Sequence, residues 1–200
     1  MCRPTLKRNF TKYLPIIILF FTALRILAAL RIPYMILADQ RYDDRMLFEN
    51  AYDLLSGVWL GSYDAYTLAK GIGYPLFLVL AKKLCLPYSM LLALLQAVGA
   101  WLFVRAVSVR WQNPYGQAIL YLLLLFSPIS LTLLVTQRLY RMAIVPGMVL
   151  VVFSGMIGLT LRKELPLKKQ LPWAILTGVA LAFFWQIRED SVWILPFIAV

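Results

Sequence analysis

Long apolar segments limit how this chain can fold, because five of them each approach the roughly 20 residues that an α-helix needs to cross a bilayer. They cover residues 13–31, 88–109, 117–135, 142–161 and 171–187, and a sixth begins at 191–200. Only 14% of the residues are charged, whereas about a quarter are charged in a typical soluble domain. The sequence therefore predicts an all-α fold, a polytopic transmembrane helix bundle in a single domain over 1–200. Because the sixth segment has barely begun at Val200, we expect the N-terminal part of a longer protein.

The basic residues lie mainly between the apolar segments. The net charge is +11, which in a soluble protein would indicate nucleic acid, but short basic loops between apolar segments follow from the positive-inside rule. With a cytoplasmic N-terminus, the cytoplasmic segments hold Arg3, Lys7, Arg8, Lys12, Arg105, Arg110, Arg162, Lys163, Lys168 and Lys169. Every acidic residue except Glu164 then lies outside. We predict a multi-pass membrane protein in contact with membrane lipid, without a nucleic-acid partner.

The first outside loop, residues 31–73, contains its own helical pattern. Apolar residues recur at helical spacing at Leu47, Phe48, Ala51, Leu54 and Leu55. Asp43 or Asp44 would cap this helix, and Ser56-Gly57 would end it. Residues 74–84 form a second apolar stretch that is too short to cross a bilayer. Both stretches predict interfacial helices, the first of them amphipathic.

The sequence offers no cofactor or metal site. It contains no histidine, and its two cysteines, Cys2 and Cys85, are far apart and lack metal-ligand spacing. Gly71-Ile72-Gly73 lacks the third glycine and the helix start of a dinucleotide-binding loop. We therefore predict neither a cofactor nor a metal.

Three polar groups at the outside face could carry chemistry. Asp43-Asp44 could supply a general base, or it could be a helix cap beside a solvated neighbour. Arg188-Glu189-Asp190 places charges between two apolar runs, where ionisable residues are more often functional than ornamental, although it could be a polar collar. The hinge 137–141 holds Arg138 and Arg141, which suit a lipid-linked phosphate because arginine binds phosphate through paired donors. Interfacial anchoring by Arg and Tyr is the equal alternative there.

These groups occur within a longer series of motifs. In chain order the series is Asp43-Asp44 after the first span, an amphipathic stretch over 44–63, Lys70-Gly71-Ile72-Gly73-Tyr74-Pro75-Leu76-Phe77, Ser127-Pro128, Arg138-Leu139-Tyr140-Arg141 and Arg188-Glu189-Asp190. The series resembles the N-terminal part of GT-C superfamily membrane glycosyltransferases. That group includes the protein O-mannosyltransferases and the bacterial aminoarabinose and lipid-linked sugar transferases.

The resemblance implies an enzyme of the bacterial cytoplasmic membrane that transfers a sugar from a polyprenyl-phosphate donor to an acceptor at the extracytoplasmic face. It implies that Asp44, or else Asp43, is the catalytic base, while Arg138, Arg141 or Arg188 would bind the donor phosphate. Many members carry an acidic residue where this chain has Arg138 and Arg141, so a metal-independent reaction is expected. The alternatives are half of a transporter or flippase, and a non-catalytic membrane assembly subunit.

The expected topology also predicts a shared site. Asp43-Asp44 and Arg188-Glu189-Asp190 each follow an outward crossing, so both groups should lie at one membrane face. Charges left in lipid are costly, so we expect Glu189 and Asp190 to line a water-filled cavity together with the aspartate pair.

Overall fold

The computed structural model describes residues 4–35, 44–59, 70–131, 137–188 and 191–197, and these are almost entirely helical. The elements are α1 (Pro4–Ala29), α2 (Met46–Leu55), α3 (Gly73–Lys83), α4 (Tyr88–Val107), α5 (Pro114–Leu125), α6 (Pro128–Leu131), η2 (Arg141–Ala143), α8 (Val145–Thr160), α9 (Leu167–Ile187) and η3 (Ser191–Phe197). Within these ranges the only extended pairing is an isolated parallel bridge between Met35 and Arg138. The predicted all-α fold is confirmed for the described part of the chain.

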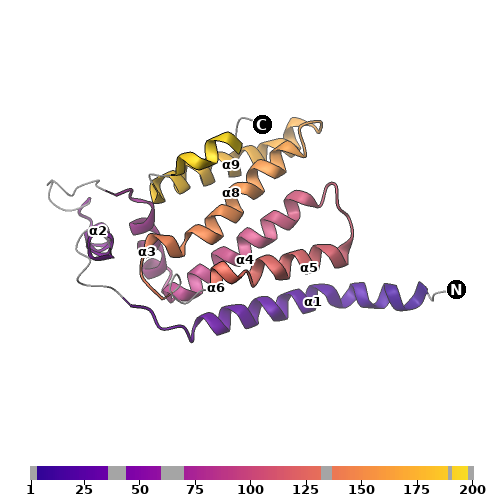
Figure 1. Ribbon diagram of the computed structural model, residues 1–200, viewed down its shortest axis with the longest axis horizontal. Coiled ribbons are helices and arrows are strands. Elements are labelled where there is room, and N and C mark those ends of the chain that lie inside the picture. The colour runs from indigo at the N-terminus through magenta and orange to yellow at the C-terminus, as the bar shows by residue number, and fades with distance from the viewer. Residues whose placement is uncertain (1–3, 36–43, 60–69, 132–136, 189–190, 198–200) are drawn as a thin grey trace.

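The five long helices pack side by side around α4. Helix α4 packs most extensively on α8, which also packs on α9, while α5 and α1 cover the other side of α4. Figure 1 shows α2 and α3 together at one end of this bundle, which we call the α2–α3 end. The α4–α5 and α8–α9 connections lie at the other end, which we call the turn end.

The helix after the α4–α5 connection begins earlier and ends earlier than the predicted segment 117–135. The sequence of residues 111–116, with its Asn-Pro pair and glycine, predicts a tight turn. In the structure Asn113 accepts hydrogen bonds from the backbone of Tyr115 and Gly116, and Pro114 occupies the first turn, so residues 114–116 already belong to α5. The helix stops at Leu125 and resumes as α6 from Pro128 to Leu131. Residues 132–136 lie outside the described part.

Two side chains from other helices bind the backbone at this interruption. Gln96 of α4 donates to the carbonyl of Leu124 at 2.7 Å, and Arg25 of α1 donates to the carbonyl of Ser130 at 3.0 Å. Arg25 is only 3% exposed. Because a buried backbone carbonyl without a donor is costly, these two contacts stabilise the broken helix.

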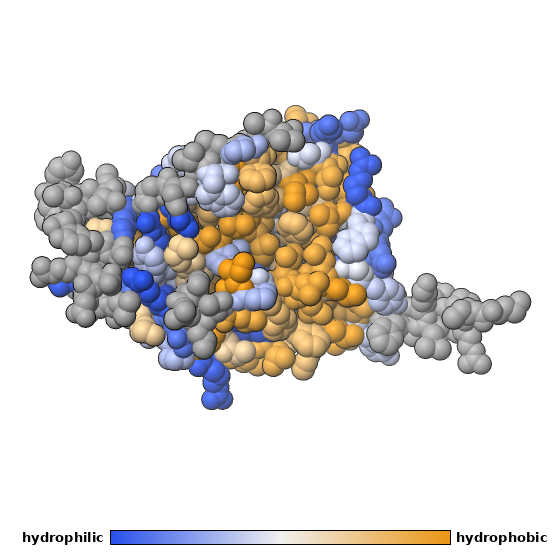
Figure 2. All heavy atoms as spheres, in the orientation of Figure 1, coloured by the Kyte–Doolittle hydropathy of each residue, from blue (hydrophilic) through white to orange (hydrophobic). Residues whose placement is uncertain are grey.

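Hydrophobic side chains cover the outside of the bundle as well as its core. Figure 2 shows a broad hydrophobic band between two hydrophilic ends. Large apolar residues exposed on the outer faces include Ile16, Leu19 and Leu27 on α1, Ile119 and Leu123 on α5, and Ile175 and Val179 on α9. Within the described residues, α4 with 20 residues and α9 with 21 are long and apolar enough to cross a membrane, judged by length and composition. The apolar parts of α1, α5 and α8 are shorter.

The remaining boundaries agree in part with the expectations. The two short helices of the first loop are present as α2 and α3, and Gly57 follows α2 with a φ of 79°, the left-handed conformation of a glycine that ends a helix. The predicted segment 142–161 is divided into η2 and α8, where Pro146 lies in the first turn. The residues of the expected sixth segment form 3-10 turns over Ser191–Phe197, and Trp193 stacks on Phe153 of α8.

Candidate functional site

A buried ion pair between Asp44 and Arg138 joins the first loop to the hinge before α8. The Nε of Arg138 donates to both carboxylate oxygens of Asp44 at 2.9 and 2.8 Å, and its Nη2 lies 2.7 Å from Oδ1. The side chain of Asp44 has 0% of its surface exposed, whereas that of Arg138 has 28% exposed. The hydrogen bond with Asp44 raises the pKa of Arg138, against the smaller opposing effect of burial.

The predicted capping role of Asp44 is wrong. The residue at the cap position of α2 is Arg45, whose backbone is helical (φ −63°, ψ −49°) and whose side chain makes no capping hydrogen bond. A capping residue needs an extended backbone and a side-chain oxygen turned toward the helix N–H groups. The carboxylate of Asp44 is instead bound by Arg138. Asp43, the other candidate cap, lies outside the described residues.

The backbone on both sides of the pair is held by the segment after α1. The N–H of Leu139 donates to the carbonyl of Met35 at 3.0 Å, and the N–H of Met35 donates to the backbone carbonyl of Gln137 at 2.8 Å. These two bonds form the isolated bridge that brackets Arg138. The hinge is therefore fixed in place by a residue about one hundred positions earlier in the chain.

Three cations surround the ring of Tyr140. The guanidinium carbon of Arg138 lies 4.4 Å from the ring centroid, the Nζ of Lys70 lies at 5.6 Å, and the guanidinium carbon of Arg141 lies at 5.8 Å. We call Tyr140 with these three residues the Tyr140 cluster. The Nε of Arg141 also lies 3.4 Å from the Tyr140 hydroxyl. An aromatic ring attracts cations through its quadrupole, so one aromatic residue gathers three cationic side chains.

Lys70 reaches the cluster because two glycines place its segment against the end of α9. A Cβ atom on Gly71 would collide with the carbonyl of Gln186, and one on Gly73 would lie 2.8 Å from the carbonyl carbon of Gln186. The loop can approach α9 this closely because neither residue has a side chain. Lys70 was not predicted from the sequence to belong to the site, although it directly precedes Gly71-Ile72-Gly73.

Arg188 extends the cationic surface from the end of α9. Its Nη1 lies 3.2 Å from the sulfur of Met142, the residue that follows Arg141. The structure therefore brings together four residues singled out from the sequence, namely Asp44, Arg138, Arg141 and Arg188, at the α2–α3 end. Asp43, Glu189 and Asp190 lie outside the described residues.

An aromatic cluster lies close to the ion pair. The hydroxyls of Tyr74 on α3 and Tyr88 on α4 lie 2.8 Å apart, and Tyr74 is fully buried. Burial is the main cause that raises the pKa of Tyr74, with smaller contributions from Tyr88 and from the charge of Asp44. Phe77 and Tyr34 pack edge-on against the Tyr88 ring. These contacts hold α3 against the start of α4.

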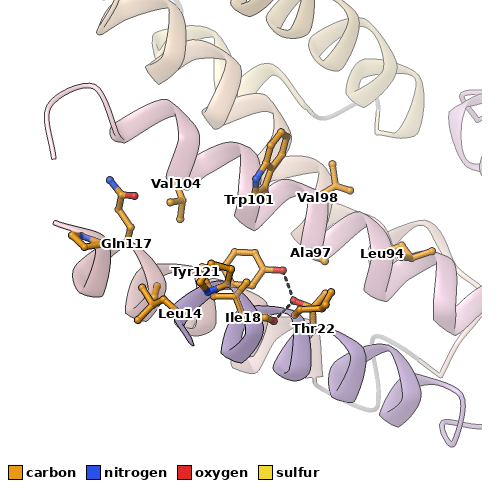
Figure 3. A pocket seen from close by; sticks show the side chains of 14 residues that line it. Leu14, Ile18, Thr22, Leu94, Ala97, Val98, Trp101, Val104, Gln117 and Tyr121 are labelled. Atoms are coloured by element: carbon orange, nitrogen blue, oxygen red, sulfur yellow. Dashed lines mark hydrogen bonds between the residues drawn. The ribbon is translucent and has the colours of Figure 1, made fainter. Parts of the chain in front are cut away.

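A separate pocket of about 700 Å³ lies between α1, α4 and α5. Figure 3 shows its mostly apolar lining, with Thr22 and Tyr121 joined by a hydrogen bond of 2.8 Å. The lining also includes Leu14, Trp101 and Gln117, which places the pocket toward the turn end. None of the residues singled out from the sequence lines it, so it is distinct from the polar site at the α2–α3 end.

Among the described residues, the chemistry available around Arg138 is that of the Asp44 carboxylate beside several cations. No group of three or more His, Cys, Asp or Glu side chains gathers there or elsewhere in the described ranges. Arginine and lysine bind phosphate through charge-assisted hydrogen bonds, and a carboxylate can accept a proton. No family model, curated protein sequence or solved structure shows a significant match to the chain.

Proposed function

We propose that the chain belongs to a multi-pass membrane glycosyltransferase of GT-C type, which transfers a sugar from a polyprenyl-phosphate donor to an acceptor at the extracytoplasmic face. The proposal depends above all on one observation, the Tyr140 cluster beside Asp44 at the α2–α3 end. A phosphate-binding surface and a carboxylate next to each other are the two parts that this reaction requires.

The surface of the molecule supports a membrane location. Apolar side chains cover the outer faces of α1, α5 and α9 in a band bounded by hydrophilic ends (Figure 2). Helix α4, at about 1.5 Å per residue, matches the hydrocarbon core of a bilayer, about 30 Å thick. Arg110 and Lys163 lie in the connections at the turn end, and Arg105 and Lys168 lie in the adjoining helix turns. We take this basic end as cytoplasmic. The α2–α3 end would then face the outside.

In the proposed reaction the acceptor hydroxyl or amine loses its proton to Asp44 or Asp43 while its oxygen or nitrogen bonds to the anomeric carbon of the sugar. The bond from that carbon to the phosphate oxygen breaks, and its electron pair leaves with the lipid phosphate. Arg138, Arg141 and Arg188 stabilise the charge of the leaving phosphate through fixed donors. A phosphate leaving group needs little help from an acid, so no second carboxylate is required.

The position of the charged groups favours an enzyme over half of a transporter. Transporters place their polar groups near the bilayer midplane, whereas Asp44 and the Tyr140 cluster lie at one end of the bundle. A non-catalytic subunit would have the same helices, but its role would not depend on the charge of the Asp44 carboxylate. Removing that charge alone therefore distinguishes an enzyme from a non-catalytic subunit.

The test is sugar transfer by the full-length protein in vesicles that contain a lipid-phosphate sugar. Replacing the base carboxylate, Asp44→Asn or Asp43→Asn, should lower the rate by about 10²–10⁴-fold, the usual contribution of a general base. Glu49→Gln is the matched control, because Glu49 is exposed on α2 and forms an ion pair with Arg45 one helical turn away. Full activity in both aspartate variants would remove the proposed base, and no transfer by the unmodified protein would remove the enzyme assignment.

A further inference from the structure

We propose that Arg138 exchanges partners during the reaction. It holds Asp44 while the donor site is empty and turns to the donor phosphate when the lipid-phosphate sugar binds, which uncovers the Asp44 carboxylate for the acceptor. This inference rests on the proposed function and adds an order of events to it: the donor binds before the base becomes available.

The geometry of the ion pair shows why an exchange is needed. Arg138 contacts both carboxylate oxygens of Asp44, within 2.7–2.9 Å. The carboxylate itself has no exposed surface, while the arginine side chain in front of it is partly exposed. An acceptor hydroxyl cannot reach Asp44 in this arrangement. A base must lie within hydrogen-bond distance of the proton that it removes, so Arg138 must withdraw before Asp44 can act.

The surroundings of Arg138 provide its second position. Its guanidinium lies over the Tyr140 ring, and Lys70 and Arg141 also lie within 6 Å of the ring centroid. A phosphate drawn to these cations would arrive next to the same guanidinium that binds Asp44. Guanidinium binds carboxylate and phosphate in the same paired geometry, so the two anions compete for one set of donors.

The exchange changes access to the carboxylate. Withdrawal of Arg138 opens the Asp44 carboxylate, which has no exposed surface in the ion pair, to the acceptor. This access appears only when donor phosphate is present.

The first test measures the affinity of the full-length protein for a polyprenyl phosphate that carries no sugar. In Asp44→Asn the competing charge is gone, so we expect binding about tenfold tighter than in the unmodified protein, a change of about 1.4 kcal/mol. If Asp44 instead only positions Arg138 for the phosphate, the same variant should bind more weakly. Weaker or unchanged binding by Asp44→Asn therefore overturns the exchange. Glu49→Gln removes an exposed charge from the same region and should leave the affinity unchanged.

The second test does not depend on one variant folding normally. A double-mutant cycle of Asp44→Asn and Arg138→Gln, read by thermal unfolding, gives the coupling between the two side chains. Saturating polyprenyl phosphate should reduce that coupling at least severalfold, and a coupling unchanged by phosphate overturns the exchange. If neither the unmodified protein nor Arg138→Gln binds polyprenyl phosphate at all, the proposed function fails. If the unmodified protein binds it, Arg138→Gln does not, and the coupling between Asp44 and Arg138 stays unchanged, only the exchange is wrong.

Discussion

Arg162 lies with its guanidinium carbon 4.4 Å from the centre of the Trp173 ring, so the end of α8 is stacked on the second turn of α9. The same guanidinium donates to the carbonyls of Ala106 and Gly158 at 3.0 Å and of Arg105 at 2.9 Å. One buried side chain thus connects the ends of α4 and α8 with the start of α9. It donates to carbonyls near the C-terminal ends of α4 and α8, where backbone donors run out.

Replacing Arg162 with leucine should destabilise the turn end. The three carbonyls lose a charged donor, and hydrogen bonds to charged groups contribute about 1.5–3 kcal/mol each. Because hydrogen bonds of one side chain are not additive, we expect a total loss of about 3 kcal/mol. This corresponds to a melting temperature about 6–12 °C lower for a chain of this size. Thermal unfolding in detergent measures it, and Lys163→Leu, at an exposed neighbouring position, serves as the control. Equal melting temperatures for the two variants would contradict the role of Arg162.

Replacing Gly71 with alanine should separate the Lys70 segment from α9. The added Cβ would occupy the position of the Gln186 carbonyl, so the loop or the helix end must move, and Lys70 must move with it. We expect a lower melting temperature together with weaker binding of polyprenyl phosphate. Gly178→Ala is the matched control, since a Cβ there meets nothing within 4 Å and alanine favours a helix. A Gly71 variant that behaves like the Gly178 variant would show that the contact with α9 is dispensable.

Tyr140→Leu should weaken phosphate binding more than Tyr140→Phe. Leucine removes the ring that the three cations share, whereas phenylalanine removes only the hydroxyl near Arg141. With cation–π contacts of about 0.5–1 kcal/mol at exposed sites, we expect leucine to lower the affinity for polyprenyl phosphate about tenfold. Titration of each variant with polyprenyl phosphate, at low and at high salt, measures this difference in affinity. Equal affinities for the two variants would show that the ring does not organise the cations.

Single cysteines at Glu49 and Glu164 should react from opposite sides of the membrane. Both positions are exposed, on α2 at one end of the bundle and in the α8–α9 connection at the other. In a background without Cys2 and Cys85, an impermeant maleimide added to intact cells should label Glu49→Cys alone. Glu164→Cys should become reactive only after the membrane is opened. Labelling of both positions in intact cells would overturn the topology and, with it, an outside location for the site.

The sequence predicted elements whose evidence is local. The apolar run of α4 and its basic end led to 88–109, close to Tyr88–Val107, and the spacing of apolar residues located α2. The start of α5 was missed because the cap at Asn113 and the proline after it were interpreted as a turn. Asn-Pro followed by glycine is compatible with both a turn and a capped helix start.

Contacts between distant residues were outside the reach of the sequence. Asp44 and Arg138 were singled out separately, by residue type and expected depth, but nothing in either segment showed that they pair. Lys70 was missed because its position depends on how closely Gly71 approaches Gln186, a contact between residues more than one hundred positions apart. Such contacts depend on the packing of whole helices, and helical periodicity carries no information about it.

The interruption between α5 and α6 has a consequence for synthesis. Its carbonyls, on Leu124 and Ser130, receive hydrogen bonds from Gln96 and Arg25, which both occur earlier in the chain. A chain made from its N-terminus therefore presents these donors before the acceptors emerge from the ribosome. The carbonyls of the broken helix therefore need not wait for donors from any later segment.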